Sequence, residues 1–109
     1  MIATSDRVQR FPSPDHVLML VVHNSDVGSV AEVRNPGRRR SYVRMAAAVL
    51  LREWCNLSYP VIGQMLGYAD HTTVLYGVRN WRRNEEAAQI VFDCNRTLVR
   101  EMPEGGKIS

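Results

Sequence analysis

The spacing of apolar residues along the chain predicts helices, and we identify no strand in it. The apolar run VLMLVV, residues 17–22, follows Ser13, a suitable N-cap, and Pro14 at the first helical position. We therefore expect a first helix that begins at Pro14, buries this run and ends at Asn24.

Two weaker signals lead to the clearest helix of the chain. A short second helix is predicted over residues 26 to about 33, although Gly28 weakens it, and Pro36-Gly37 then marks a turn. The strongest helical pattern spans about residues 39–55, because apolar residues recur there at i, i+4, i+7 and i+11. These residues are Val43, Ala47, Leu50 and Trp54.

Two short helices are predicted next, with Gly67 in the turn between them. Ser58 is expected to cap the first, over residues 59–66, whose buried face holds Ile62, Met65 and Leu66. Asp70 is expected to cap the second, which extends to about Arg83 and turns Val74, Val78 and Trp81 inward. Two short helices joined by a glycine-containing turn form a helix-turn-helix.

A last helix is predicted over residues 85–100, burying Ile90, Leu98 and either Val91 or Cys94. The pattern as a whole predicts a small all-α domain over residues 13–101, with the helix-turn-helix at about 58–83. Residues 1–12 are predicted to be a flexible arm and residues 102–109 a tail. The chain has 109 residues, enough for one modest core.

Positive charge is concentrated in the middle of the chain. Residues 34–83 contain nine arginines and two acids, a net charge of +7, whereas the rest carries five basic and nine acidic residues, a net −4. A basic segment in an otherwise acidic protein favours a polyanionic partner. Arginine grips phosphate and guanine with two hydrogen bonds. The alternative is that arginines such as those of "GRRR" form a solvated surface loop.

Other classes of function have little support in the sequence. No apolar run is long enough for a membrane span, and the first residues do not resemble a secretory signal. Two cysteines without a signal predict free thiols in the cytoplasm. No CxxC or paired Cys/His spacing indicates a metal, and no nucleophile–base pair indicates an enzyme, so we expect neither a cofactor nor catalysis.

The start of the second helix of the helix-turn-helix carries the candidate DNA-binding side chains. In this motif the second helix enters the major groove, where its N-terminal residues reach base edges. There Asp70 can accept from cytosine, His71 can donate to guanine, and the Thr72 methyl can pack on thymine. Thr73 is expected to reach a phosphate. Two alternatives stay open: Asp70 acts only as a cap, and the tryptophans belong to the core.

The segment IGQMLGYADHTTVLYGVR, residues 62–79, resembles the signature of the C-terminal DNA-binding domain of the DnaA family of bacterial replication initiators, roughly IGxxFGGRDHTTVxxA. The upstream segment RRRSYVRMAAAVLLREWCNLSYPVIG also follows the family's order and spacing, with S-x-P-x-I-G before the turn. The resemblance covers about residues 14–84. It implies a helical DNA-binding domain whose partner is double-stranded DNA.

The resemblance also implies individual roles in binding the family's DNA site, the DnaA box. It places Asp70, His71 and Thr72 on bases in the major groove, and Tyr59 and Pro60 near the DNA and a thymine methyl. It implies backbone contacts for Thr73, Arg44 and Arg52. Independently of the resemblance, Arg79, Arg82 and Arg83, at the basic end of the second helix, are further candidates for the DNA backbone. It implies that an arginine of the basic loop enters the minor groove; the candidates are Arg38, Arg39 and Arg40, with Arg34 a weaker one.

The chain departs from the family pattern beside the turn. Tyr68 stands where the family has its second glycine, and Ala69 stands where it has an arginine; Met45 replaces a glutamine and Asn80 a lysine. These differences leave the exact DNA site open.

The 109 residues contain no phosphate-binding loop G-x-x-x-x-G-K-[ST], so no nucleotide partner is expected and the sequence predicts a free-standing DNA-binding head of the phage or bacterial kind. Two functions remain: regulation of replication or transcription at DnaA-box-like sites, or a module that binds and inhibits a protein of that machinery. Activation or repression, and the oligomeric state, stay undetermined.

Overall fold

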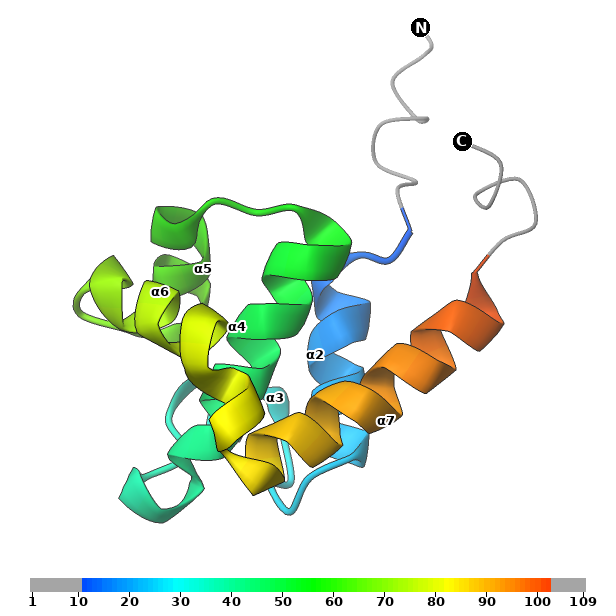
Figure 1. The fold of residues 1–109 in the computed structure, drawn as a ribbon, viewed down its shortest axis with the longest axis horizontal. Coiled ribbons are helices and arrows are strands. Elements are labelled where there is room, and N and C mark those ends of the chain that lie inside the picture. Colours follow the sequence, from blue (N-terminus) through cyan, green and yellow to red (C-terminus); the bar gives the residue numbers. More distant parts are fainter. Residues whose placement is uncertain (1–10, 103–109) are drawn as a thin grey trace, which may run out of the picture.

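The computed structural model describes residues 11–102, and in this range the chain folds into α-helices and 3-10 helices without a strand (Figure 1). The all-α prediction is confirmed. The predicted arm and tail lie outside the described residues, apart from residues 11, 12 and 102. The α-helices are α2 (Pro14–His23), α3 (Val30–Arg34), α4 (Ser41–Cys55), α5 (Tyr59–Leu66), α6 (His71–Asn80) and α7 (Glu85–Glu101), and the 3-10 helices are η1 (Arg38–Arg40) and η2 (Trp81–Arg83).

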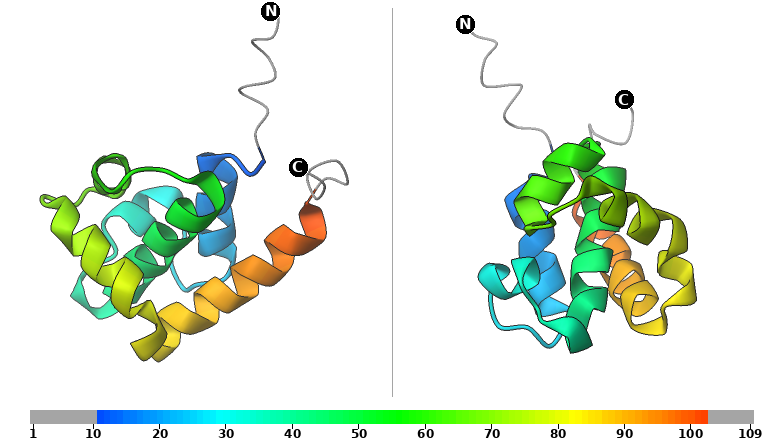
Figure 2. Two further views of the ribbon diagram at one scale, coloured as in Figure 1. Left: turned by 45° about the horizontal axis from the view of Figure 1, so that its top comes forward. Right: turned by 90° about the vertical axis from the view of Figure 1, so that its left-hand side faces the viewer.

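Helix α4 forms the centre of the domain and packs against α2, α3, α5, α6 and α7. Six consecutive residues of α4, from 46 to 51, are fully buried. A helix that is apolar and buried on all sides is surrounded by other elements. The remaining helices therefore occupy positions around α4, with α5 and α6 on one side and α7 on another (Figures 1 and 2).

The three predicted caps are confirmed. The side chains of Ser13, Ser58 and Asp70 each accept a hydrogen bond from a backbone N–H in the first turn of α2, α5 and α6, respectively. Asn84, which the sequence pattern does not single out, caps α7 in the same way. Such caps satisfy donors that have no partner inside the helix. The predicted apolar run of α2 is buried at Val17, Leu18, Leu20 and Val21, whereas Met19 is exposed.

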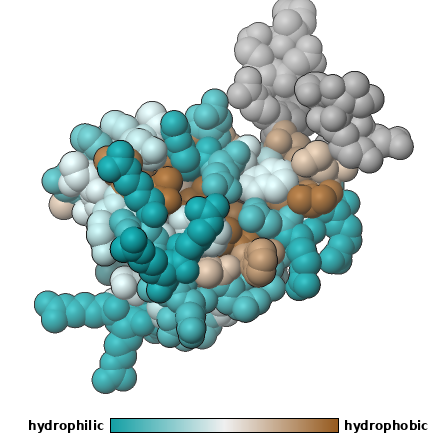
Figure 3. Space-filling model, in the orientation of Figure 1, coloured by the Kyte–Doolittle hydropathy of each residue, from teal (hydrophilic) through white to brown (hydrophobic). Residues whose placement is uncertain are grey.

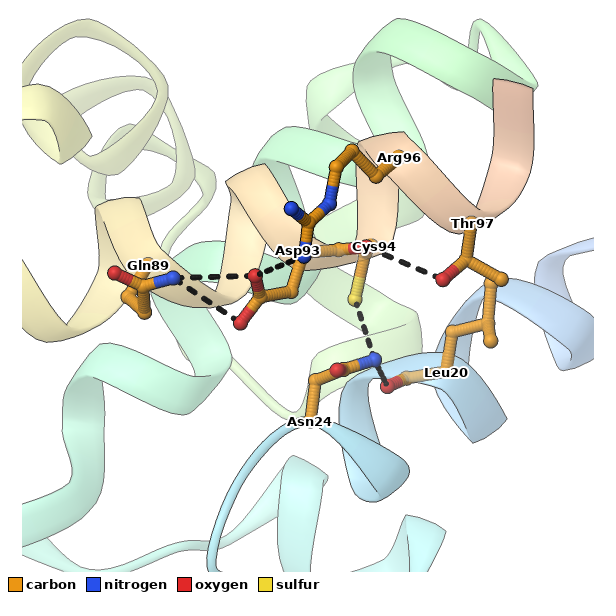
Figure 4. A network of polar contacts seen from close by, with 7 residues as sticks. All are labelled: Leu20, Asn24, Gln89, Asp93, Cys94, Arg96 and Thr97. Carbon is orange, nitrogen blue, oxygen red and sulfur yellow. Dashed lines mark hydrogen bonds and ion pairs between the residues drawn. The ribbon is translucent and has the colours of Figure 1, made fainter. Parts of the chain in front are cut away.

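Asn24 connects the end of α2 to α7. Its side-chain amide donates to the Leu20 carbonyl at 2.9 Å and lies 3.6 Å from the Cys94 sulfur (Figure 4). On the same stretch of α7, the Asp93 carboxylate accepts from Gln89 at 3.1 Å and from Arg96 at 3.4 Å. The predicted inward residues of α7 are all buried, Val91 and Cys94 both included.

Three predicted boundaries were wrong. The second helix begins at Val30 and not at residue 26, because Ser29 caps it and Glu32 accepts from the Gly28 N–H. This Ser-x-x-Glu sequence is the signature of a capping box, which the apolar pattern alone does not show. The second difference is at the start of α4, which begins at Ser41 and not at about residue 39, because residues 38–40 form the 3-10 helix η1.

The third wrong boundary is at the other end of the helix-turn-helix, where α6 ends at Asn80 and η2 replaces its predicted last turn. Four predicted core residues, Trp54, Met65, Val78 and Trp81, are only partly buried. The Trp54 indole N–H donates to the Asn95 side chain at 2.7 Å, which explains why one edge of the ring stays at the surface.

Candidate nucleic-acid interface

Helices α5 and α6 and the short helix η1 lie on the same side of the molecule, at the left of Figure 1 and toward the viewer in the right-hand panel of Figure 2. Hydrophilic residues project from the lower left of the space-filling view, where η1 lies (Figure 3). The two ion pairs found within residues 11–102 are His16–Glu101 and Arg96–Asp93. Within residues 11–102, none of the nine arginines of residues 34–83 pairs with a carboxylate, so no ion pair there neutralises their charges.

The turn between α5 and α6 depends on the glycine at position 67. Gly67 ends α5 in the left-handed conformation, with φ of 77°, and a Cβ there would lie 3.2 Å from the Arg34 carbonyl oxygen. The Tyr68 N–H then donates to the Gly63 carbonyl at 2.9 Å, which closes the end of the helix. A Cβ on Gly63 itself would lie 3.6 Å from the His71 Cβ, so α5 passes close to the start of α6.

Asp70 begins α6 and points into solvent. Its Oδ1 accepts from the Thr72 N–H at 3.0 Å, and its backbone carbonyl accepts from the Thr73 N–H at 3.1 Å. The hydrogen bond from Thr72 lowers the pKa of the Asp70 carboxyl, because it stabilises the charged form. The predicted cap is therefore confirmed, and the carboxylate is held at the mouth of the helix in its ionised form.

The three residues after Asp70 are exposed together. His71, Thr72 and Thr73 occupy the first turn of α6, while the next residue, Val74, is fully buried. One side of the helix thus packs on the core, and its N-terminal turn presents polar side chains to solvent. The exposed positions continue along α6 and η2 at Arg79, Arg82 and Arg83, whereas Leu75 is half-buried.

Arg44 joins three elements behind this turn. Its Nη1 donates to the Arg34 carbonyl at 3.0 Å and to the Leu66 carbonyl at 3.2 Å, so α4 is tied to the ends of α3 and α5. The guanidinium lies over the Tyr68 ring, 4.1 Å from its centroid. The Nε atom is buried and has no hydrogen-bond partner within residues 11–102. Arg44 thus has a structural role in addition to the phosphate contact that the sequence predicts.

Arg52 makes a similar set of contacts about two turns further along α4. Its Nη1 donates to the Leu57 carbonyl at 2.9 Å, and its guanidinium lies 4.7 Å from the centroid of the Tyr59 ring. Pro60, next to Tyr59 in the first turn of α5, is exposed. Both predicted phosphate-binding arginines are therefore oriented by a backbone carbonyl and a tyrosine, on the side of α4 that carries the helix-turn-helix.

The three arginines of η1 differ in their surroundings. Arg38 and Arg39 are exposed, whereas Arg40 turns back and donates to the Asp26 carbonyl at 3.1 Å. Of the three candidates for the minor groove, the first two therefore extend freely from this loop. Arg34, the weaker candidate, is also exposed, and its carbonyl is the one that Arg44 holds.

Sequence reasoning missed the role of Tyr68. In the sequence Tyr68 is only a departure from the glycine of the family pattern, yet its ring covers the Arg44 guanidinium, and burial raises the pKa of its hydroxyl against a smaller opposite effect of Arg44. The signal available was the coincidence of an arginine-rich helix with a tyrosine just after the turn, because guanidinium groups stack on aromatic rings.

Neither a membrane segment nor a metal site adds to this surface. No helix within residues 11–102 combines the length and the apolar character needed to cross a membrane. In the same part of the chain, no three His, Cys, Asp or Glu side chains are grouped as metal ligands would be.

Comparison with known proteins agrees with the geometry. A family model described as the bacterial dnaA protein helix-turn-helix matches residues 14–80. The chain is 52% identical over 68 residues to the chromosomal replication initiator protein DnaA of Thermomicrobium roseum, which covers 61% of this chain and 14% of that protein. The DnaA protein of Corynebacterium jeikeium is 33% identical over 91 residues, covering 82% of this chain and 15% of that protein.

The chain therefore spans about one seventh of the length of these relatives. No solved structure matches it. The matched residues run from the first described helix to the end of α6, and so contain the whole turn at Gly67 with the helices on both sides of it. The chain belongs to the bacterial DnaA helix-turn-helix family, a family of DNA-binding domains.

Proposed function

We propose that this protein binds double-stranded DNA sequence-specifically at sites similar to the DnaA box, with α6 in the major groove. The observation that carries the proposal is the exposed run from Asp70 to Thr73 at the start of α6. These side chains offer a carboxylate, an imidazole and two hydroxyls, the groups that contact base edges and phosphates at the N-terminus of a recognition helix.

The surrounding arginines supply the sequence-independent part of the binding. Arg44 and Arg52, presented by α4, and the arginines at the end of α6 are suited to phosphates on either side of the groove. The exposed pair Arg38 and Arg39 in η1 is suited to the neighbouring minor groove, where arginine is attracted by the negative potential. Tyr59 and Pro60 offer apolar surface at the start of α5 for a thymine methyl.

The relatives that share this domain are named chromosomal replication initiators. We infer that this protein acts at related sites and regulates replication initiation or transcription, in the bacterial cytoplasm or nucleoid. DNA binding by a helix-turn-helix requires neither a bound nucleotide nor a catalytic step.

The test is selection of bound sites from random duplexes, followed by binding measurements at several salt concentrations. We expect a DnaA-box-like consensus and an affinity that falls steeply with salt. His71→Ala should weaken binding to the best site by about 1–3 kcal/mol and leave binding to random duplex nearly unchanged. His23→Ala, at the exposed end of α2, is the matched control and should change neither.

Selection that returned no consensus, together with salt-independent or absent binding, would refute the proposed function. Capture of a replication or transcription protein in its place would support the alternative of a protein-interaction module.

A further inference from the structure

The ring of Tyr68 covers the guanidinium of Arg44, whose nitrogens differ in their hydrogen bonding. Arg44 uses Nη1 for two carbonyls, and its Nε is buried without a partner in the described part of the chain. Nη2 donates to no carbonyl or carboxylate within residues 11–102. Nη1 is bonded to two carbonyls and the ring covers the plane at 4.1 Å, so these contacts hold the guanidinium, and Nη2 is the nitrogen left to donate to a ligand.

This orientation depends on a residue that the family pattern lacks. A glycine at position 68, as in that pattern, has no side chain to stack, and the arginine would then be held by its carbonyls alone. The Arg52–Tyr59 pair is similar but less constrained, with one Nη1–carbonyl bond and a ring at 4.7 Å instead of two bonds and a ring at 4.1 Å. Two arginines of α4, both beside the helix-turn-helix, are thus each oriented by a tyrosine.

Orientation before binding matters because a long side chain loses rotamer freedom when it contacts a phosphate. A guanidinium that is already fixed by stacking and one hydrogen bond loses less of this freedom. We propose that Tyr68 is a positioning residue for DNA binding, which holds Arg44 in the conformation that presents Nη2 to a phosphate. The proposal rests on the proposed function, since it assigns Arg44 to a DNA phosphate.

A double-mutant cycle tests the proposal, using the full chain and duplexes that carry its best selected site or random sequence. Tyr68→Leu removes the ring and fills part of its space. In the otherwise unchanged protein it should weaken binding to both duplexes about two- to fivefold, the range expected for losing an arginine–ring stack. The slope of log K against log salt should not change, because the charge of Arg44 is still present. Arg44→Ala should lower that slope by about 1.

The coupling between the two positions separates positioning from a general structural role. In the Arg44→Ala background, Tyr68→Leu should have no further effect on binding. An equal loss in both backgrounds, or no loss in the unchanged protein, would overturn the proposal. Tyr68→Phe keeps the ring and should bind within about twofold of the unchanged protein, since the stack does not need the hydroxyl; a loss as large as that of Tyr68→Leu would also overturn it.

Three controls complete the experiment. Circular dichroism follows folding, and if Tyr68→Leu does not fold, Tyr68→Met replaces it in the cycle, because methionine fills similar space without a ring. Phe92→Leu makes a similar change at an exposed position of α7, which packs on α2, α4 and η2, and should leave binding unaltered. Failure of the unchanged protein to bind DNA would refute the proposed function and this proposal together, whereas salt-dependent binding without coupling would refute this proposal alone.

Discussion

Replacing Gly67 by alanine tests whether the turn of the helix-turn-helix is as tightly determined as the structure indicates. Gly67 has φ of 77° and ψ of 21°, and the position of its missing Cβ lies 3.2 Å from the Arg34 carbonyl oxygen. That oxygen also accepts from Arg44 Nη1 at 3.0 Å. A methyl group at position 67 therefore meets a backbone atom that is already engaged.

The expected loss of stability has three parts. A residue with a side chain costs about 1–2 kcal/mol in the left-handed conformation. The less flexible unfolded chain of the alanine variant offsets about 0.4–1 kcal/mol of this. Displacing the Arg34 oxygen weakens its hydrogen bond from Arg44, which adds about 0.5–1.5 kcal/mol. We expect Gly67→Ala to lower the free energy of unfolding by about 1–3 kcal/mol, and the midpoint of thermal unfolding by about 4 °C or more.

Thermal and urea unfolding, followed by circular dichroism, measure this loss. Asn56→Ala is the matched control, because Asn56 ends α4 in the same left-handed conformation, with φ of 55°, and already carries a Cβ. Its replacement changes only the backbone preference and should cost less than about 1 kcal/mol. Two results would contradict this expectation: Gly67→Ala unfolds at the same midpoint as the unchanged protein, or it loses no more free energy of unfolding than Asn56→Ala. Either result would show that the close approach of position 67 to the Arg34 oxygen does not affect stability.

Three further outcomes follow from the described side chains. Arg52→Ala should weaken DNA binding about equally for all sequences and lower the salt slope by about 1, as should Arg44→Ala; a changed base preference with an intact slope would contradict a phosphate contact. Asp70→Asn should keep the cap and the unfolding temperature at neutral pH, but shift the selected site from cytosine toward adenine, because an amide also donates; an unchanged consensus would exclude a base contact by this residue. Burial raises the pKa of Cys94 to about 12 and that of Cys55 to about 11, so both thiols should react slowly with a disulfide reagent at pH 8 and fast in urea; equal rates in both conditions would contradict their burial.

Local signals explain why the helix-turn-helix could be located from the sequence. Ser58 and Asp70 each bond to a backbone N–H a few residues along, and Gly67 adopts a conformation that few other residues accept, so these boundaries depend on neighbouring residues only. The start of α3 was also locally encoded, in Ser29 and Glu32, but by hydrogen-bonding groups that an apolar pattern does not detect.

The double role of Arg44 had no such local signal. Its partners are carbonyls 10 and 22 residues away, and each is available only because a helix ends there and leaves its last carbonyls unpaired. Which side chain reaches such a carbonyl depends on how α3, α4 and α5 are packed. The sequence therefore indicates that Arg44 contacts a DNA phosphate, but its hydrogen bonds to the two carbonyls can be seen only in the folded domain.

Capping and DNA contact at Asp70 do not exclude one another in this geometry. A carboxylate has two oxygens and about four acceptor sites. The cap uses Oδ1 for the Thr72 N–H, which leaves further acceptor sites on the exposed carboxylate. Because the bond to Thr72 lowers the pKa of Asp70, the carboxylate stays ionised and purely an acceptor. The carboxylate that starts α6 can therefore keep its cap and still accept from a cytosine amino group through its remaining acceptor sites.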